Sequence, residues 1–462
     1  MKAHDALYID GAWRPAAGRD VIEVVNPVDE QVVGRVPAGT APDVDTAVRA
    51  ARAALPGWAA TAPADRAARL AALRDVLTAR KEEIAETVTA ELGAPLEFSR
   101  AVHAGLPISV AGSYAELAAT HVFEERVGNS VVHHEPVGVV GAITPWNYPL
   151  HQIVAKVAPA LAAGCTVVLK PAENTPLVAQ LFAGAVHEAG LPAGVFNLVT
   201  GLGPVAGQAL VEHPGVDLVS FTGSSAVGRR IGAAAGAAVK KAALELGGKS
   251  ANVILPGADL ARAVAVGVAN VMANSGQTCS AWTRMLVHTD QYDEAVALAT
   301  TAAAKYGDRI GPVVSAEQRA RVRAHIERGR AEGARLVAGG ADAPREKGYF
   351  VRPTVFADVT PEMSIAQEEI FGPVLTILRY ADEEDALRIA NGTVYGLAGA
   401  VWAGDEARAV AFARRMDTGQ VDINGGRFNP LAPFGGYKQS GVGRELGAHG
   451  LAEYLQTKSL QF

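Results

Sequence analysis

Cys279 is the side chain of this 462-residue chain whose surroundings best fit chemistry. It lies in ANSGQTCSA (273–281), where its neighbours are small or polar. A cysteine is more often inert core than nucleophile, and Cys165, in the apolar stretch ALAAGCTVVLKP, fits that structural role. The polar neighbours of Cys279 favour a nucleophile, which needs access and a pKa lowered by a helix N-terminus or a backbone nest.

Two polar segments follow neighbouring predicted strands. Asn147 in ITPWNYP (143–149) either caps the helix that begins there or donates its amide N–H to an oxyanion forming on a carbonyl carbon. Lys170 and Glu173 in VLKPAENTP follow the next strand and form either a surface ion pair or a site for ribose hydroxyl groups. Because parallel sheets bind ligands at the carboxyl ends of their strands, all three residues are candidates for one site.

Glu245 stands between two leucines in LELGGKS, at the end of an apolar run. A carboxylate in apolar surroundings is unfavourable unless it is paired or functional, so Glu245 is a candidate general base with a raised pKa. Glu368 and Glu369 in QEEIFGPV form a second carboxylate pair, for which capping is the simpler role.

Two glycine-containing turns are candidates for binding phosphate. GLGPVAG (201–207) has the spacing G-x-G-x-x-x-G, which differs from the dinucleotide fingerprint G-x-G-x-x-G and is weak evidence alone. FTGSSAVG (221–228) is a second strand-to-helix turn, whose backbone N–H groups could hold a pyrophosphate. Glycine turns are often only tight connections, but two on one sheet make a dinucleotide more plausible.

Composition narrows the function classes. The net charge of −6 and the pI near 6.0 give no reason to expect a nucleic-acid or membrane partner. Two cysteines exclude a disulfide framework, and the eleven histidines contain no H-E-x-x-H motif, so we expect no metal. The N-terminus lacks the apolar stretch of a signal peptide, and no apolar run reaches transmembrane length. We therefore expect a cytoplasmic enzyme that acts on a small molecule.

The elements that must position these residues alternate between strands and helices. The first part of the chain predicts helices at 42–54, 63–92 and about 100–120, then an exposed hairpin at 126–138. From 137 onward, buried-strand runs alternate with helices as far as about residue 248, which predicts a parallel, doubly wound sheet. A second α/β region follows and carries Cys279, with helices at 259–274, 290–305 and 315–332. The tail LAEYLQTKSLQF could end as a strand that pairs with another element or subunit.

Eight collinear stretches make the chain resemble one known family over essentially its whole length. They are TPWNYP, LKPAENTP, GLPAGVFNLV, FTGSSAVG, LELGGKS, NSGQTCSA, EEIFGPV and PFGGYKQSG. They resemble the corresponding motifs of the NAD(P)-dependent aldehyde dehydrogenase superfamily. The resemblance implies a non-acylating, bacterial aldehyde dehydrogenase of class EC 1.2.1.-, with 1.2.1.3 expected within that class. The resemblance implies a Rossmann-like cofactor domain, a second α/β catalytic domain and a small β oligomerisation segment.

The resemblance also implies residue roles. Cys279 matches the catalytic cysteine, Asn147 matches the oxyanion-hole asparagine, and Glu245 matches the general base that activates water against a thioester. Lys170 and Glu369 match the residues that hold the cofactor's riboses. Lys170 is also expected to be one of the catalytic residues. Glu173 matches the position that disfavours a 2′-phosphate, so NAD is expected over NADP.

Two further sets are carried over from the family. The expected cofactor-binding residues are Ile143, Thr144, Pro145, Trp146, Lys170, Ala172, Glu173, Gly203, Phe221, Gly223, Ser224, Val227, Leu246, Gly247, Glu369 and Phe371. The expected lining of the aldehyde tunnel is Tyr148, His151, Gln152, Thr278, Ser280 and Phe434, with Ala155 and Ala273 at positions that are often bulky in relatives.

The family architecture assigns segments as well. Residues 1–113 and 137–246 would form the NAD-binding domain, 247–452 the catalytic domain, and 114–136 with 453–462 the oligomerisation segment of a homodimer or homotetramer. The chain departs from relatives near 305–315, where a connecting loop is several residues shorter. The catalytic motifs are intact, so we expect activity to survive.

Three rival interpretations remain open. A coenzyme A-acylating relative would usually lack the glutamate at 245, a non-catalytic member would have lost the nucleophile, and a cysteine hydrolase would need a histidine partner near Cys279. No arginine stands at the tunnel positions, which favours uncharged aliphatic or aryl aldehydes over an ω-oxo acid, the semialdehyde alternative.

Overall fold

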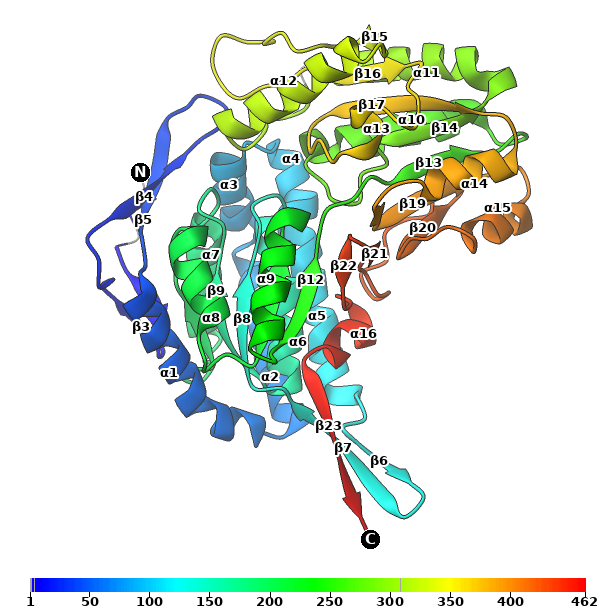
Figure 1. The fold of residues 1–462 in the computed structure, drawn as a ribbon. Coiled ribbons are helices and arrows are strands. Elements are labelled where there is room, and N and C mark those ends of the chain that lie inside the picture. The colour runs from blue at the N-terminus through cyan, green and yellow to red at the C-terminus, as the bar shows by residue number, and fades with distance from the viewer. Residues whose placement is uncertain (1, 4, 308) are drawn as a thin grey trace.

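Two α/β bodies and a projecting β-ribbon make up the molecule (Figure 1). The computed structural model describes residues 2–3, 5–307 and 309–462. The larger body is built on an eight-stranded sheet and the smaller on a seven-stranded sheet. The α/β fold class predicted from the sequence is confirmed.

The eight-stranded sheet has the strand order β22-β12-β11-β8-β9-β10-β2-β3, and the strands from β12 to β10 run parallel. Every residue of β8, β9 and β11 is buried, as expected for strands covered by helices on both faces. The strands are β2 (Leu7–Ile9), β3 (Ala12–Arg14), β8 (Val139–Ile143), β9 (Thr166–Lys170), β10 (Phe196–Leu198), β11 (Leu218–Thr222), β12 (Lys241–Glu245) and β22 (Gly441–Val442).

Helices cover both faces of this sheet (Figure 1). The helix that bears on the site, α6, starts with a proline at its first turn and ends at Gly164, whose φ of +94° gives the left-handed cap. The helical elements of this body are α1 (Ala41–Ala59), α2 (Pro63–Ala79), α3 (Lys81–Leu92), α4 (Leu96–Phe98), η1 (Ser99–Ala104), α5 (Gly105–Thr120), α6 (Pro149–Ala163), α7 (Leu177–Glu188), η2 (Gly203–Gly207), α8 (Gln208–Glu212) and α9 (Ser225–Ala237).

The single helix predicted over 63–92 is wrong, because the chain bends at Arg80. This residue has φ −97° and ψ +13°, and it separates α2 from α3. Both helices bury an apolar stripe in the same core, Leu70, Leu73 and Leu77 from α2 and Ile84, Val88 and Leu92 from α3. The apolar periodicity therefore continues across the break and hides it.

The seven-stranded sheet has the order β15-β16-β17-β14-β13-β19-β20, parallel except for β15. Its strands are β13 (Ala251–Ile254), β14 (Arg284–His288), β15 (Arg335–Ala338), β16 (Thr354–Ala357), β17 (Val374–Tyr380), β19 (Ala398–Trp402) and β20 (Gln420–Ile423). The helical elements of this half are α10 (Leu260–Met272), η3 (Ala273–Gly276), η4 (Thr289–Gln291), α11 (Tyr292–Ala304), α12 (Ala316–Ala331), α13 (Ser364–Gln367), α14 (Glu383–Asn391) and α15 (Glu406–Ala413). The helices predicted at 259–274, 290–305 and 315–332 correspond to α10, α11 and α12.

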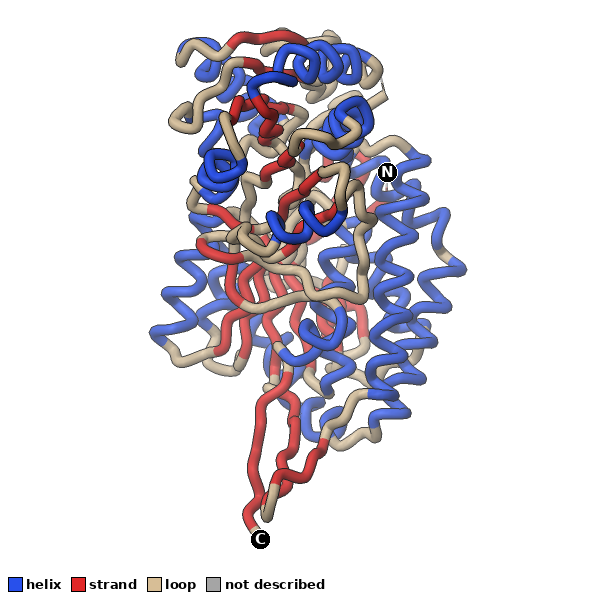
Figure 2. Tube along the Cα trace, turned by 90° about the vertical axis from the view of Figure 1, so that its right-hand side faces the viewer, coloured by secondary structure: helices blue, strands red, loops and turns tan. Residues whose placement is uncertain are grey.

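The projecting ribbon joins the hairpin to the end of the chain (Figure 2). Strand β23 pairs antiparallel with β7, and β7 with β6. The prediction that the tail pairs as a strand with another element is confirmed. The ribbon and the remaining elements are β6 (Glu124–Val127), β7 (Ser130–Pro136), β23 (Leu455–Gln461), α16 (Gly447–Ala452), the sheet of β1 (Lys2–Ala3), β4 (Val21–Val25) and β5 (Val32–Pro37), and the pair β18 (Tyr395–Gly396) and β21 (Tyr437–Lys438).

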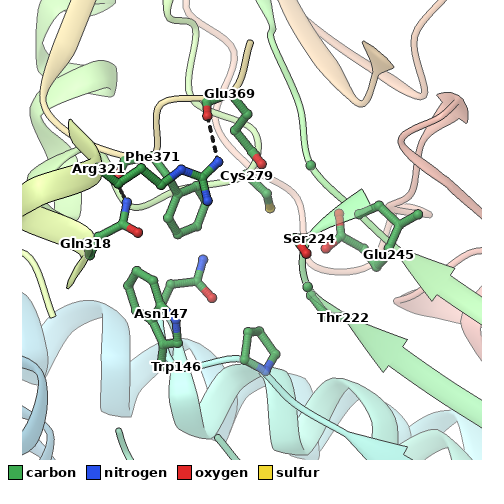
Figure 3. A pocket seen from close by; sticks show the side chains of 14 residues that line it. Trp146, Asn147, Thr222, Ser224, Glu245, Cys279, Gln318, Arg321, Glu369 and Phe371 are labelled. Carbon is green, nitrogen blue, oxygen red and sulfur yellow. Dashed lines mark hydrogen bonds between the residues drawn. The ribbon is translucent and has the colours of Figure 1, made fainter. Parts of the chain in front are cut away.

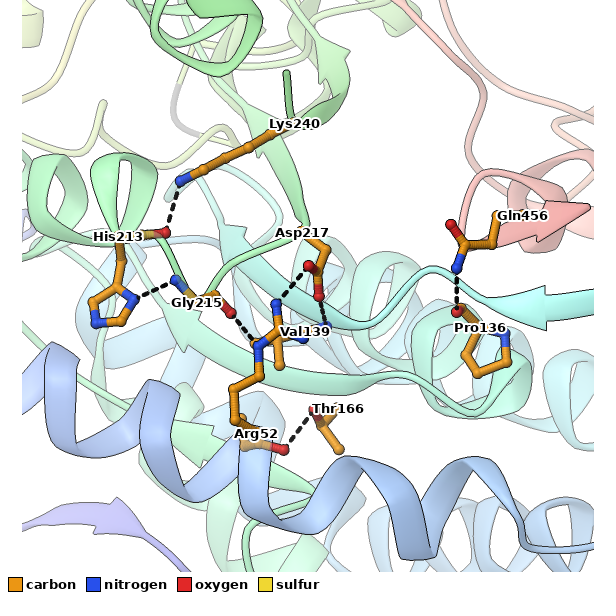
Figure 4. A network of polar contacts seen from close by, with 10 residues as sticks. Arg52, Pro136, Val139, Thr166, His213, Gly215, Asp217, Lys240 and Gln456 are labelled. Carbon is orange, nitrogen blue, oxygen red and sulfur yellow. Dashed lines mark hydrogen bonds and ion pairs between the residues drawn. The ribbon is translucent and has the colours of Figure 1, made fainter. Parts of the chain in front are cut away.

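A polar network fixes the amino ends of the central strands, opposite the ends that carry the candidate residues (Figure 4). Asp217 accepts 2.5 Å from the Arg52 guanidinium of α1 and 2.7 Å from the backbone N–H of Val139 in β8. A Cβ on Gly138, whose φ is +129°, would lie 1.9 Å from Asp217 Oδ2. Only glycine therefore fits where the ribbon enters the sheet. Among the described helices, none has the length and apolarity needed to cross a bilayer.

Candidate active site

Adjacent parallel strands bring three candidate residues to one sheet edge. Strand β8 ends at Ile143, so the following segment delivers Asn147, while β11 and β12 end side by side at Thr222 and Glu245. Cys279 comes from the other body, on the segment that follows α10 and η3. The site therefore lies where the two bodies meet (Figure 1).

These residues surround one cavity of about 150 Å³ (Figure 3). Most of its lining was predicted from the sequence; Thr222, Gln318 and Arg321 were not. The full lining is Pro145, Trp146, Asn147, Thr222, Gly223, Ser224, Glu245, Leu246, Gly247, Cys279, Gln318, Arg321, Glu369 and Phe371.

The turn that presents Cys279 has an unusual backbone. Asn274, Ser275 and Gly276 have φ values of +49°, +57° and +74°, three left-handed residues in succession. Asparagine and glycine tolerate this region best. A Cβ on Gly276 would lie 2.0 Å from the carbonyl oxygen of Gly372, so the turn packs directly on the loop that follows Phe371.

Asn147 is held by a buried amide network that includes this turn. Its Nδ2 donates to the Gln277 carbonyl at 3.0 Å, and Asn274 Nδ2 donates to the Asn147 carbonyl at 2.8 Å. Gln277 in turn donates through Nε2 to Asn274 O at 3.0 Å and accepts from Val314 N at 2.8 Å. Because one N–H of the Asn147 amide is used in this way, the other remains for an oxyanion. Sequence reasoning missed the positioning role of Asn274 and Gln277.

The surroundings of the Cys279 thiol favour its protonated form. Burial raises its pKa well above the usual value, and the carboxyl groups of Glu245, Glu369 and Glu445 raise it further, while a hydrogen bond from the Ser280 backbone lowers it. The expected lowering by the local backbone is present in the Ser280 hydrogen bond, but burial and the nearby carboxylates outweigh it, because the site is dry and rich in carboxylates. Cys279 is half-buried and keeps accessible surface, whereas Cys165 is completely buried, as its apolar stretch predicted.

Glu245 is 3% exposed, and neither carboxyl oxygen has a hydrogen-bond partner among the described residues. Burial, followed by the charge of Glu445, raises its pKa well above the usual value. Lys156 opposes this shift: it is fully buried on α6, donates to Thr222 Oγ1 at 2.6 Å and forms an ion pair with Glu445. Lys156 and Glu445 were missed, although a lysine inside an apolar helical stripe was a usable signal.

Aromatic rings form one end of the cavity. The rings of Trp146 and Phe371 meet edge to face with centroids 5.4 Å apart. Glu369 accepts from Gly248 N at 3.0 Å, and a Cβ on Gly247 would collide with its carboxylate at 2.3 Å. Burial raises the pKa of Glu369.

Helix α12 contributes two polar side chains to the cavity that the sequence motifs did not predict. Gln318 Nε2 donates to the Phe371 carbonyl at 2.8 Å, and Arg321 donates to the Glu369 carbonyl at 3.1 Å (Figure 3). Glu368, the other member of the predicted carboxylate pair, points elsewhere and pairs with Arg328 at 2.9 Å.

A second cavity of about 420 Å³ adjoins the first, since Trp146 and Gln318 line both. Glu173 lines it and receives the Lys170 ammonium at 3.1 Å. Lys170 is 3% exposed, and burial lowers its pKa against the opposing effect of Glu173.

The remaining predicted cofactor residues lie around the same sheet edge. Ser224 caps α9 and accepts from Val227 N at 3.4 Å, which leaves other N–H groups of the first turn free for an anion. Gly203 begins η2, and a Cβ added to it would have open space around it, with no described atom within 4 Å. Val227 is 40% exposed, whereas Ile143, Thr144, Ala172 and Phe221 are buried.

The predicted tunnel residues divide into two groups. Tyr148 Oη and Thr278 Oγ1 are 2.7 Å apart, and Tyr148, His151, Thr278 and Ser280 are half-buried. Phe434 is buried, packs edge to face on Phe428 at 6.2 Å, and borders a hollow shared with Glu245 and Glu445. Gln152 and Ala155 are buried on α6, and Ala273 is half-buried. Within the described ranges, no cluster of three or more metal-ligating side chains was found.

Comparisons with known proteins agree with this geometry. The family model "Aldehyde dehydrogenase family" matches residues 13–460. The chain is 47% identical to 3-succinoylsemialdehyde-pyridine dehydrogenase from a Pseudomonas species, over 100% of this chain and 99% of that protein.

Solved structures agree as well. A mutant of aldehyde dehydrogenase C (AldC) from Pseudomonas syringae, in complex with NAD+ and octanal, superposes with a TM-score of 0.98 at 46% identity, covering 99% of this chain and 96% of that one. The aldehyde dehydrogenase of Mycobacterium tuberculosis, with NAD+, gives 0.97 at 45% identity over 100% and 99%. The chain belongs to the aldehyde dehydrogenase family.

Proposed function

We propose that this aldehyde dehydrogenase oxidises an aldehyde to the carboxylic acid, with NAD as oxidant and Cys279 as nucleophile, a reaction of class EC 1.2.1.-. The observation that carries the proposal is the convergence of Cys279, Asn147 and Glu245 on one cavity that also holds an aromatic slot. A nucleophile, an oxyanion donor and a base are the three groups that acyl chemistry requires.

The residues present fit a dinucleotide. Gly223 and Gly247 leave room that a Cβ would fill, since it would meet Phe221 at 2.5 Å and Glu369 at 2.3 Å. The start of α9 offers N–H groups to a pyrophosphate, and Lys170 and Glu369 offer polar atoms to the riboses. When bound, NAD supplies the hydride acceptor. We propose NAD over NADP because the Glu173 carboxylate would repel a 2′-phosphate; a higher kcat/KM with NADP would contradict this.

The chain's own groups act in two stages. The Cys279 thiol first loses its proton to solvent, and the thiolate then attacks the aldehyde carbon. The Asn147 amide with the Cys279 backbone N–H holds the resulting oxyanion. After oxidation of that adduct to a thioester, Glu245 takes a proton from water as the water oxygen attacks the thioester carbon. The carbon–sulfur bond then breaks, which releases the carboxylic acid and returns Cys279 as a thiolate. Burial raises the pKa of Glu245, which makes its carboxylate a stronger proton acceptor than that of an exposed glutamate.

The substrate we favour is an uncharged aliphatic or aryl aldehyde. The AldC structure contains octanal, an uncharged aliphatic aldehyde. A semialdehyde is the second candidate, because the name of the 47% identical relative specifies a semialdehyde joined to a pyridine ring. A strong preference for succinic semialdehyde over hexanal would contradict the first choice.

We further propose that 1–113 and 137–246 form the NAD-binding domain, 247–452 the catalytic domain, and 114–136 with 453–462 the oligomerisation segment. In support, the two large sheets separate near residue 248, while β6, β7 and β23 form a sheet of their own. Strand β22 crosses this division, because it adds to the edge of the first sheet beside Glu245.

The test is reduced-cofactor formation from NAD and hexanal, compared between the native enzyme and Cys279→Ala, with and without coenzyme A. We expect turnover that depends on Cys279 and ignores coenzyme A. If acyl-coenzyme A forms, the enzyme transfers the acyl group to coenzyme A and does not hydrolyse the thioester. Full activity of Cys279→Ala would refute the proposal that Cys279 is the nucleophile.

A further inference from the structure

Cys279 has a second polar neighbourhood that does not belong to the cofactor cavity. Tyr148 and Thr278, joined at 2.7 Å, lie next in sequence to Asn147 and Cys279, yet neither lines that cavity. The ring of His103 lies against Tyr148 with centroids 5.2 Å apart. A substrate that reaches Cys279 past Tyr148 and Thr278, away from the rings of Trp146 and Phe371, would meet these groups.

Helix α6 extends this neighbourhood. Tyr148, His151 and Gln152 have the spacing i, i+3 and i+4, so they share one face of the helix. His151 lies close enough to His103 for its charge to lower the pKa of that residue. The two histidines therefore lie near each other and near Tyr148, the residue that follows Asn147.

Several polar atoms here lack partners. No described group hydrogen-bonds to either ring nitrogen of His103, although the Asn274 amide lies nearby, and Gln152 Oε1 and His151 Nδ1 are also unpaired. His103 is 1% exposed and Gln152 4%. Buried polar groups in native proteins are almost always paired, so such a concentration beside a nucleophile points to a ligand that supplies the missing partners.

These groups are uncharged near neutral pH. Burial lowers the pKa of His103 to about 3 and that of His151 to about 4; Asn274 opposes the first shift, and Glu445 opposes the second while Lys156 adds to it. Each neutral imidazole offers one N–H donor and one acceptor nitrogen. Lys156, the cation near His151, is already paired with Glu445, so a carboxylate would find no free counter-charge among these groups.

We infer that the substrate is an uncharged aldehyde that carries a second, neutral hydrogen-bonding group, such as a ring nitrogen or a ketone, and that His103, His151 and Gln152 bind this group. The inference rests on the proposed aldehyde oxidation and names its substrate class. It adds specificity determinants that the catalytic residues do not supply.

An isosteric pair of aldehydes tests it. 3-(Pyridin-3-yl)propanal differs from 3-phenylpropanal only by a ring nitrogen in place of C–H, so the ratio of their kcat/KM values isolates hydrogen bonding from shape. We expect the pyridyl compound to be favoured about tenfold, the effect of one recovered hydrogen bond in a buried site. 3-(4-Carboxyphenyl)propanal should be the poorest of the three.

Variants locate the effect. His103→Phe and His151→Phe should bring the pyridyl-to-phenyl ratio close to one. The matched control is His121→Phe, another histidine with an unpaired ring nitrogen, which packs on Phe123 at 4.7 Å away from the site; it should keep the native ratio.

The outcomes separate the two proposals. Equal kcat/KM for both ring compounds in the native enzyme, a preference for the carboxylate, or a native ratio in both site variants would overturn this inference and leave aldehyde oxidation standing. No turnover of any of the three, or of hexanal, would refute the proposed function and this inference with it.

Discussion

At the residue scale, the chemistry of the site depends on how buried charges balance. Glu245, Glu369 and Glu445 all raise the pKa of the Cys279 thiol, while Lys156 is the buried cation that opposes the rise at Glu245. A buried ion pair is weak evidence for stability but strongly affects its neighbours' protonation. Lys156 and Glu445 are therefore positioned to set the pH range in which Glu245 works as a base.

Lys156→Met should move the activity profile to higher pH. Lys156 lowers the pKa of Glu245, so its loss raises that pKa, and ionised Glu245 then appears only at higher pH. The acidic limb of kcat against pH checks this. Lys156→Met/Glu445→Gln removes both charges and should return the limb toward its native position; an unchanged limb in Lys156→Met would contradict the account.

Asn274→Gly should lower kcat by about 10- to 100-fold with little change in KM. Glycine keeps the φ of +49° but removes both donor bonds that fix the Asn147 segment, and loss of one oxyanion donor costs about 100- to 1000-fold in kcat. Steady-state kinetics measure the split. Asn270→Gly, on the adjoining helix α10, removes the acceptor for Trp282 N; it is the structural control and should leave kcat near native.

At the element scale, the site is assembled by turns rather than by helices or strands. Strands β8, β11 and β12 fix one edge of the cavity. The left-handed turn that precedes Cys279 packs at Gly276 against the loop at Gly372. Because the carboxyl ends of parallel strands lie at the same edge of a sheet, the sequence predicted which residues meet at this edge. The three consecutive left-handed residues carried no comparable signal.

Gly276→Ala should inactivate the enzyme and lower its free energy of unfolding by about 1–3 kcal/mol, since alanine disfavours φ +74° and its Cβ would overlap the Gly372 carbonyl. Thermal unfolding and turnover test this together. Gly57→Ala, in α1 with nothing within 4 Å of the added carbon, is the matched control and should be neutral or slightly stabilising. Equal behaviour of the two variants would refute the packing argument.

At the scale of the whole molecule, segments that lie far apart in the sequence come together around the cavity. Collinear motifs located most of the cavity lining, because each motif follows a strand end or a turn. Gln318, Arg321 and Glu445 were missed because tertiary packing, not local pattern, brings them to the site from distant segments. Lys156 did carry a local signal, because it is a lysine within the apolar stripe of α6. The sequence did not predict the break between α2 and α3 at Arg80, because the apolar spacing of the two helices continues through it.

The ribbon leads to a prediction about assembly. It projects from the body and exposes apolar side chains, with Val127 of β6 56% exposed and Phe462, just after β23, 75% exposed (Figure 2). Such surface is usually covered by a partner. Light scattering at micromolar concentration should give a dimer or tetramer mass, and deletion of 456–462 should reduce it; a native monomer mass would contradict the proposed oligomerisation segment.

The central claim is that Cys279 and Glu245 act in sequence on one aldehyde. The direct measurement is a rapid-mixing record of reduced cofactor from NAD and hexanal with Glu245→Gln, beside Cys279→Ala. Without the base, the thioester should accumulate, so Glu245→Gln should give a burst approaching one equivalent per active site followed by turnover at least about 100-fold slower than native. Cys279→Ala should give no burst. Sustained native turnover by Glu245→Gln, or a burst from Cys279→Ala, would contradict the account.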